Sequence, residues 1–278
     1  MYPTLIRSGP ITIGTHDFFS ILALVVGIAI YYRALRRQGL LDERIVLVSM
    51  AVVVGGILGA RTITAWENTD EIGQALAAGA PISWVILHGN KSILGGIAGG
   101  FIAGVLAKRA LGYTRSTGDS YALAIAVATG IGRVGCFLSE LPLGTPTSLP
   151  WGISVSPSLA ASFQRCPGCD LPMHPSMLYE IGFNLVAAAL IVRFGRRVPV
   201  QGDLLKLYLL SAFSFRFLVE FVRGNEVQLL GLTGPQVVLV PLIGWLAVHF
   251  WRRYRSGAWH LPAAPAAPRM AEIGEGAG

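Results

Sequence analysis

Charged side chains are scarce in this sequence. Of its 278 residues only 13% are Asp, Glu, Lys or Arg, whereas 53% are hydrophobic, and the mean hydropathy is +0.59. A soluble globular domain carries about 25% charged residues, so the composition excludes an ordinary soluble protein and favours a polytopic membrane protein. No internal repeat is evident. The first apolar stretch also lacks the basic leader region and the cleavage site of a signal peptide, so we interpret it as a retained helix.

Seven stretches are long and apolar enough to cross a hydrocarbon core of about 30 Å. They lie near residues 17–35, 45–66, 94–111, 119–138, 177–193, 203–222 and 233–251. Glycine recurs closely in two of them, as in VVVGGILGAR and LGGIAGGFIAG, and small residues let membrane helices approach each other. The sequence therefore predicts an all-α bundle of seven transmembrane helices within residues 1–255, with an outer loop at about 139–176. Residues 256–278, rich in Ala, Pro and Gly, are predicted to form a disordered cytoplasmic tail.

Lysine and arginine are distributed unevenly between the predicted loops. Fifteen of them follow the first, third, fifth and seventh spans, whereas four lie on the other side. Because these residues accumulate in short cytoplasmic loops, we expect the N-terminus outside and the C-terminus in the cytoplasm. The net charge of +7 is then mostly an orientation signal, and we expect no nucleic-acid partner.

Three arginines remain, and each lies inside a predicted span. Arg61, Arg133 and Arg216 are on the second, fourth and sixth spans, roughly 20–24 Å from the cytoplasmic end at about 1.5 Å per residue. Burying an arginine in a membrane costs about 2.5 kcal/mol or more, so such residues are candidates for a functional site. One interpretation is that each side chain extends toward the outer headgroups. Because all three lie at one depth, we favour a shared anionic ligand.

The segment SFRFLVEFVRG places two more charges beside Arg216. Glu220 follows it by four residues and Arg223 by seven, a spacing that puts all three on one helix face. We expect Glu220 to neutralise and orient both guanidiniums, which leaves donors free for another anion. Guanidinium forks match phosphate oxygens, and near the outer leaflet the available phosphate is that of a phospholipid headgroup.

The outer loop carries further polar residues. It ends in HPSMLYE, where His174, Tyr179 and Glu180 meet the start of the fifth span. The loop also contains Cys166 and Cys169 in CPGC. Two thiolates and one imidazole leave a zinc site one ligand short, so we favour a disulfide or free thiols. We expect no metal and no cofactor.

Taken together, these motifs resemble the bacterial prolipoprotein diacylglyceryl transferase family. The segments GRVGCFLSELPLGTPTSLPW, HPSMLYE and FRFLVEFVR are similar to family motifs around the fourth, fifth and sixth helices, and GAR is similar to one in the second. The resemblance covers about residues 11–252. It implies a multi-pass enzyme of the bacterial inner membrane whose site faces the outer leaflet. It also implies transfer of a diacylglyceryl group from phosphatidylglycerol to the cysteine thiol of a lipobox in a secreted precursor, with release of glycerol phosphate.

The resemblance and the charge pattern together suggest roles for individual residues. We expect catalytic roles for Arg133, Arg216, Glu220 and His16. Substrate-binding residues are expected to be Arg61, Gly144, His174, Tyr179, Glu180 and Arg223. The arginines would hold the phosphate, and a base would generate the thiolate that attacks. Of the outer-side histidines, which are His16, His88 and His174, we choose His16 as the base.

Several positions depart from the family pattern. Leu94 stands where the family has a histidine, and Cys136 where it has an asparagine; Leu141 replaces a glutamate, with Glu140 one position early, and His16 replaces a tyrosine. We therefore interpret the chain as a divergent paralogue. Three hypotheses stay open: the family's transferase, a phospholipid-binding protein without catalysis, and a transferase with another acceptor.

Overall fold

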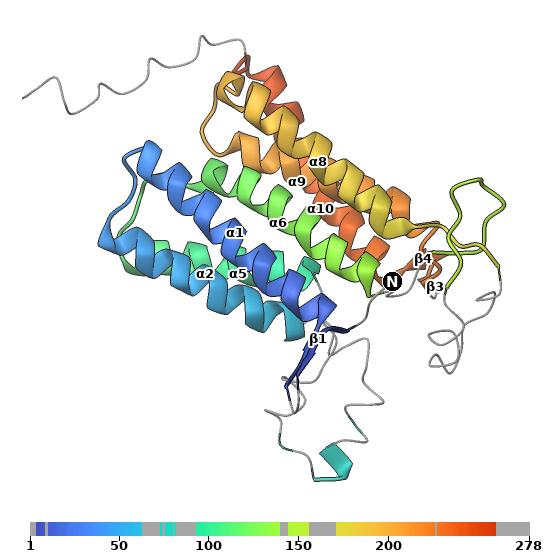
Figure 1. Cartoon of the computed structure of the whole chain (residues 1–278). Coiled ribbons are helices and arrows are strands. Elements are labelled where there is room, and N and C mark those ends of the chain that lie inside the picture. The colour runs from blue at the N-terminus through green and yellow to red at the C-terminus, as the bar shows by residue number, and fades with distance from the viewer. Residues whose placement is uncertain are drawn as a thin grey trace, which may run out of the picture.

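A computed structural model describes residues 4–8, 11–62, 73, 76–79, 81, 93–139, 144–155, 171–225 and 227–259. Within these residues the chain is mostly helical (Figure 1). The long helices are α1 (Thr15–Arg37), α2 (Glu43–Thr62), α5 (Ile93–Ala110), α6 (Gly118–Leu138), α8 (Ser176–Phe194), α9 (Asp203–Glu220) and α10 (Gly234–Arg255). Each coincides with one of the apolar stretches found in the sequence, because an uninterrupted apolar stretch in a membrane satisfies its backbone only as a helix or a closed barrel.

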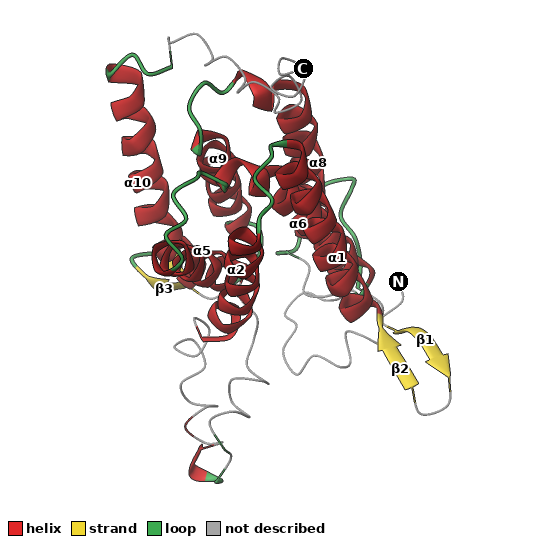
Figure 2. Cartoon of the chain, turned by 90° about the vertical axis from the view of Figure 1, so that its left-hand side faces the viewer, coloured by secondary structure: helices red, strands yellow, loops and turns green. Residues whose placement is uncertain are grey.

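Short elements fill the connections. Strands β1 (Thr4–Ser8) and β2 (Ile11–Gly14) form an antiparallel hairpin, as do β3 (Val227–Leu229) and β4 (Leu232–Thr233). A 3-10 turn, η2 (Gly195–Arg197), follows α8. Figure 2 shows the β1–β2 hairpin projecting beyond the end of the helices. The sequence analysis did not predict either hairpin. The predicted second span continued to residue 66, and its last four residues lie outside the described residues. The disordered tail was predicted from residue 256, but residues 256–259 form a turn after α10 in which Trp259 Nε1 donates to Asp203 Oδ2 over 3.4 Å; the rest of the predicted tail lies outside the described residues.

Five of the described helices, α1, α2, α6, α8 extended by η2, and α10, are long and apolar enough to cross a membrane. Large apolar side chains are also widely exposed on the helix surfaces: Leu185 is 65% exposed, Val192 68% and Leu218 64%. By contrast, Arg133, Glu180 and Glu220 are buried. Apolar residues outside and charged residues inside are what a bilayer imposes, because lipid solvates the former and excludes the latter. The chain is therefore a membrane protein.

Helix α6 occupies the centre of the bundle. It packs against α1, α8 and α9, while α9 also packs against α10. Its contact with α1 requires glycine at position 135, since a Cβ there would lie 2.5 Å from Phe19 Cβ. This central position brings Arg133 near the end of α6 into reach of both α8 and α9.

Helices α2 and α5 form a separate pair in which the backbones nearly touch. A Cβ on Gly59 would overlap the carbonyl oxygen of Gly95, and one on Gly99 would overlap that of Gly55. The glycine-rich stretches therefore face protein, as the sequence predicted, because only residues without a side chain allow so close an approach. The pairing holds the first turn of α5, which carries Leu94, beside the rest of the bundle.

The turns at one end of the bundle are joined by hydrogen bonds. Tyr113 Oη donates to the Leu40 carbonyl oxygen over 3.3 Å, and Gly202 N donates to Asp119 Oδ2 over 2.7 Å. The basic last turns of α1, α5, α8 and α10 lie at this end, opposite the β-hairpins (Figure 1). The other end carries the described parts of the loop after α6, which is fastened to the turn after α9 by the hydrogen bond from Thr145 N to Val222 O.

Candidate functional site

Glu180, in the second turn of α8, is the residue on which three arginines converge. Its carboxylate forms an ion pair with Arg133 Nε of α6, and its Oε1 lies 3.1 Å from Arg223 Nη1 and 4.0 Å from Arg216 Nε. The Glu180 side chain is only 6% exposed. A buried carboxylate among three guanidiniums holds α6, α8 and the end of α9 together, since none of these charges is stable in a membrane interior alone.

A second buried carboxylate, Glu220, lies at the last residue of α9. It pairs with Arg216 Nη1 one turn earlier, and its Oε1 accepts hydrogen bonds from Asn225 Nδ2 and from Thr233 Oγ1, the latter over 3.0 Å. The sequence analysis predicted that Glu220 would orient Arg223 as well, and this was wrong. Helix α9 ends at Glu220, so Arg223 lies in the following turn, from which its guanidinium reaches Glu180.

The cluster has an excess of one positive charge. Arginine keeps its proton at neutral pH, so three guanidiniums, those of Arg133, Arg216 and Arg223, face the two carboxylates of Glu180 and Glu220. The arrangement is suited to one additional anion.

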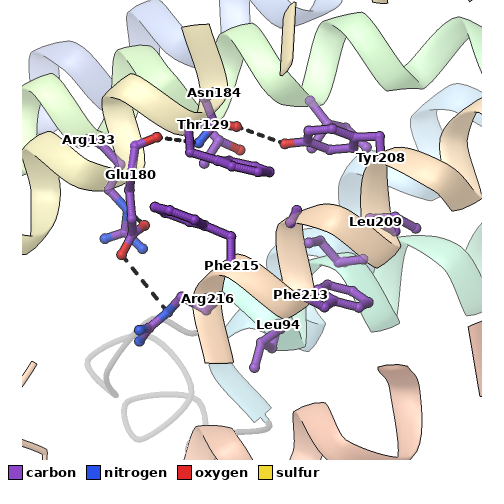
Figure 3. A pocket seen from close by; sticks show the side chains of 14 residues that line it. Leu94, Thr129, Arg133, Glu180, Asn184, Tyr208, Leu209, Phe213, Phe215 and Arg216 are labelled. Atoms are coloured by element: carbon purple, nitrogen blue, oxygen red, sulfur yellow. Dashed lines mark hydrogen bonds and ion pairs between the residues drawn. The ribbon is translucent and has the colours of Figure 1, made fainter. Parts of the chain in front are cut away.

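Arg133 and Arg216 line one end of a largely apolar cavity. Its walls come from α5, α6, α8 and α9, with the fourteen lining residues drawn in Figure 3. Arg133, Glu180 and Arg216 lie at one side of this view, Leu94 and Phe213 form another wall, and Phe215 lies between them. The enclosed volume is about 70 Å³, smaller than the roughly 300–1,000 Å³ of formed small-molecule sites, so a lipid would fill it with only part of its structure. A cavity with charged groups at one end and apolar walls elsewhere fits an amphipathic ligand.

Gly144, in the loop after α6, fits tightly between the segment that contains His174 and the turn that contains Val222. Its N–H donates to the His174 carbonyl oxygen over 2.7 Å, and a Cβ would overlap the Val222 carbonyl oxygen. Gly144 therefore sets the position of the loop against the turn that carries Arg223. This steric need is a structural reason for glycine at the site, and its proposed part in substrate binding stays a prediction.

His174 belongs to a hydrogen-bonded group in the same loop. Tyr179 Oη accepts a hydrogen bond from Trp151 Nε1 over 2.8 Å and lies 3.1 Å from His174 Nδ1. Because the indole N–H only donates, the Tyr179 hydroxyl hydrogen is available to His174 Nδ1. His174 and Tyr179 thus contact each other, as neighbours of Glu180 rather than as lining residues of the cavity.

Two other predicted residues lie apart from the cavity lining. Arg61 is in the last turn of α2 and is partly buried. His16 is in the first turn of α1, with its side chain 34% exposed and Nδ1 3.8 Å from Asp17 Oδ1. Its backbone packs near Gly135, two residues after Arg133, and two residues correspond to about 200° around a helix. His16 therefore approaches α6 from a different side than the cavity does.

Of the positions that depart from the family pattern, His16, Leu94 and Cys136 lie among the described residues. Leu94 lines the cavity together with Arg133 and Arg216. Cys136 Sγ lies 3.9 Å from Arg133 Nη1 and packs against Met173 and Met177. The other positions discussed, Glu140, Leu141, Cys166, Cys169 and His88, lie outside the described residues.

Sequence reasoning missed three polar residues of the cavity. Thr129, Asn184 and Tyr208 line it beyond Phe215 as seen in Figure 3. The available signal was helical spacing, because Thr129 precedes Arg133 by four residues and Asn184 follows Glu180 by four, which places each on the same face as a member of the cluster.

Comparison with known proteins identifies the family of this chain. The family model for prolipoprotein diacylglyceryl transferase matches residues 3–252. Two relatives are named phosphatidylglycerol–prolipoprotein diacylglyceryl transferase and match most of the chain. The protein from Bordetella avium is 31% identical, and the match covers 83% of this chain and 84% of the relative. The protein from Geobacter sulfurreducens is 30% identical, and the match covers 84% of this chain and 86% of the relative. A relative of that name in Frankia alni is 30% identical over 82% of this chain, which spans 60% of its length. The chain therefore belongs to the prolipoprotein diacylglyceryl transferase family.

Proposed function

We propose that this protein transfers the diacylglyceryl group of phosphatidylglycerol to the lipobox cysteine of a secreted prolipoprotein. The cysteine thiolate attacks the glycerol carbon that carries the phosphate ester, so a C–S bond forms as that C–O bond breaks. Glycerol phosphate leaves with the bonding electron pair, and the thiol proton passes to a base. The family membership and the names of the relatives support this reaction.

The observation that carries the proposal is the charge of the cluster beside the apolar cavity. Phosphatidylglycerol has one phosphodiester charge and two apolar tails. Arg133, Arg216 and Arg223 exceed Glu180 and Glu220 by one positive charge, and guanidinium forks match phosphate oxygens. The same positive field would stabilise the second negative charge that develops as glycerol phosphate leaves.

Individual roles follow from position. Arg133 and Arg216 line the cavity and would hold the phosphate directly, while Glu180 and Glu220 keep the guanidiniums in place. Gly144, His174 and Tyr179 lie where an extended precursor peptide arriving from outside would meet the loop. For Arg61 we propose attraction of anionic headgroups toward the site, and for His16 removal of the thiol proton.

We further propose seven spans, α1, α2, α5, α6, α8, α9 and α10, with the N-terminus outside and the cluster in the outer leaflet of the bacterial inner membrane. The end that bears the basic last turns would face the cytoplasm. Trp251 and Tyr254, exposed by 59% and 67% at that end of α10, suit the headgroup region. Residues 1–255 would form the membrane domain, and we propose a disordered cytoplasmic tail from residue 260 instead of the predicted 256, because Trp259 is hydrogen-bonded to Asp203.

Leu94 favours two alternative functions. None of the described histidines lines the cavity, and the position where the family has a histidine provides an apolar wall. A protein that holds phosphatidylglycerol without transferring it, or that transfers its diacylglyceryl group to another acceptor, would share the cluster and the cavity. Binding and turnover must therefore be measured separately.

The test uses purified protein in phosphatidylglycerol vesicles with a lipobox peptide, followed by mass spectrometry of the peptide. A diacylglyceryl mass increase with equimolar glycerol phosphate is expected for the parent. Arg133→Ala should abolish it and Arg133→Lys restore it only in part, because lysine offers a point charge instead of a fork. Arg193→Ala, at the other end of the bundle, is the matched control. Lipid-dependent thermal stabilisation without peptide modification would reject transfer to a lipobox thiol and favour the binding protein.

A further inference from the structure

Three buried polar side chains form a second layer in the cavity, which we call the inner polar layer: Thr129 of α6, Asn184 of α8 and Tyr208 of α9. Tyr208 Oη donates to Asn184 Oδ1 over 2.9 Å, and Thr129 lies beside the same hydroxyl. Asn184 Nδ2 donates to the Glu180 carbonyl oxygen over 2.8 Å. Figure 3 shows the layer separated from Arg133, Glu180 and Arg216 by the ring of Phe215, which stacks on Phe183 at 4.5 Å.

The hydrogen bonds of this layer leave one donor without a described acceptor. A side-chain amide has two N–H donors, and the hydrogen bond to Glu180 O uses one of those on Asn184. Asn184 and Tyr208 are each only 5% exposed, so bulk water is not the remaining partner. A buried donor in an apolar cavity favours a ligand that brings an acceptor oxygen to this depth.

The spacing of the two layers matches the two polar parts of a phospholipid. Thr129 and Asn184 are each four residues from a member of the arginine cluster, which is about 6 Å along a helix. A glycerol backbone of about that extent separates the phosphate of a diacyl phospholipid from its ester carbonyls. The layer lies on the side of the cluster nearer the bundle's middle, which is where the esters of an outer-leaflet lipid would lie.

We infer that the inner polar layer recognises an ester carbonyl of the diacylglyceryl group, with Asn184 Nδ2 as the donor and with Tyr208 and Thr129 holding the amide in position. This rests on the proposed function and extends it, because the cavity then selects lipids with ester-linked tails. If these hydrogen bonds only join α8 to α9, lipids with and without ester carbonyls should be transferred equally well. If the layer recognises an ester carbonyl, the lipid that has one should be transferred faster.

The test compares diacyl phosphatidylglycerol with its dialkyl ether analogue, which lacks both carbonyls but has the same phosphate ester to be broken. We expect the parent to show a kcat/KM about fivefold higher for the diester, the effect of one hydrogen bond. In the double variant Asn184→Leu, Tyr208→Phe this ratio falls to about one. Removing both partners leaves neither with an unmade hydrogen bond, so the fold tolerates the change better than a single replacement. Ser211→Ala is the control: this residue is exposed on the same helix, and its hydroxyl donates to the Tyr208 backbone carbonyl and not to a side chain of the layer, so the parent ratio should be kept.

Equal kcat/KM for the two lipids in the parent would overturn the inference. So would a double variant that loses activity on both lipids equally, since that is the signature of a purely structural hydrogen bond. If the double variant does not fold, Tyr208→Phe is the fallback: it removes only the hydroxyl that positions the Asn184 amide, so the ratio should fall part of the way toward one, and an unchanged ratio would contradict the inference. If the parent transfers neither lipid, the proposed function fails. The thermal stabilisation by each lipid then tests ester recognition separately, with a larger shift for the diester expected and equal shifts contradicting it.

Discussion

Nη1 of Arg223 lies 3.1 Å from Oε1 of Glu180, so the last arginine of the FRFLVEFVR motif is tied to α8 and not to the glutamate of its own motif. Because Arg133 pairs with the same carboxylate, a single side chain on α8 holds the arginines of α6 and of the turn after α9. The geometry of the anion-binding cluster therefore depends on Glu180 as much as on the arginines.

Replacing Glu180 by Gln should strongly destabilise the protein and weaken binding of phosphatidylglycerol. Three guanidiniums would then face only Glu220, and removing one partner of a buried ion pair costs about 3–5 kcal/mol. Thermal unfolding in detergent micelles and lipid binding measure the two effects. Asp17→Asn is the control, since that carboxylate is 69% exposed and its loss should cost about 0.5 kcal/mol. A Glu180→Gln protein with parental stability and affinity would show that the carboxylate does not organise the cluster.

Gly99→Ala should separate α2 from α5. The new methyl group would overlap the Gly55 carbonyl oxygen, and overpacking of this kind costs about 1–3 kcal/mol. Gly244→Ala on α10, where nothing lies within 4 Å of the added Cβ, should instead be neutral or stabilising by about 0.5–1 kcal/mol, because alanine favours the helix. Thermal unfolding measures the effect, and the melting temperature of Gly99→Ala should be below that of Gly244→Ala. Equal melting temperatures would mean that the close glycine contact between α2 and α5 is not needed for stability.

Leu94→His should raise the rate of diacylglyceryl transfer. It puts a titratable group with a pKa of about 6.5 into the wall of the cavity that also contains Arg133 and Arg216. Initial rates of lipobox peptide modification measure the effect, with Leu94→Gln as a polar control that cannot accept the thiol proton. If both variants change the rate equally, proton transfer from this wall does not limit the reaction.

His16→Ala should lower turnover while leaving phosphatidylglycerol binding largely intact. A thiol with a pKa of about 8.5 is mostly protonated at neutral pH, so loss of a base matters most there, and the deficit should shrink as the pH approaches 9. Rates measured from pH 6.5 to 9, beside lipid affinities, provide the comparison. Unchanged turnover at neutral pH would remove His16 as the base, in line with its place on another side of α6 than the cavity.

The sequence alone was sufficient for the helices and for the first outline of the site. The bounds of α1, α6 and α8 differ by at most two residues from the predicted spans 17–35, 119–138 and 177–193, because an apolar stretch of membrane length forms its hydrogen bonds locally. Arg133 and Arg216 could be identified for a related reason: a charge inside such a stretch is costly wherever the helix packs.

Only the tertiary structure decided which groups meet. It joined Arg223 to Glu180, placed Leu94 in the cavity wall, and brought Asn184 and Tyr208, 24 residues apart, into one hydrogen bond. Spacing along a helix defines a face but not the neighbour that the face meets. That neighbour depends on how closely the backbones approach and how each helix is rotated, and these are properties of the packed bundle.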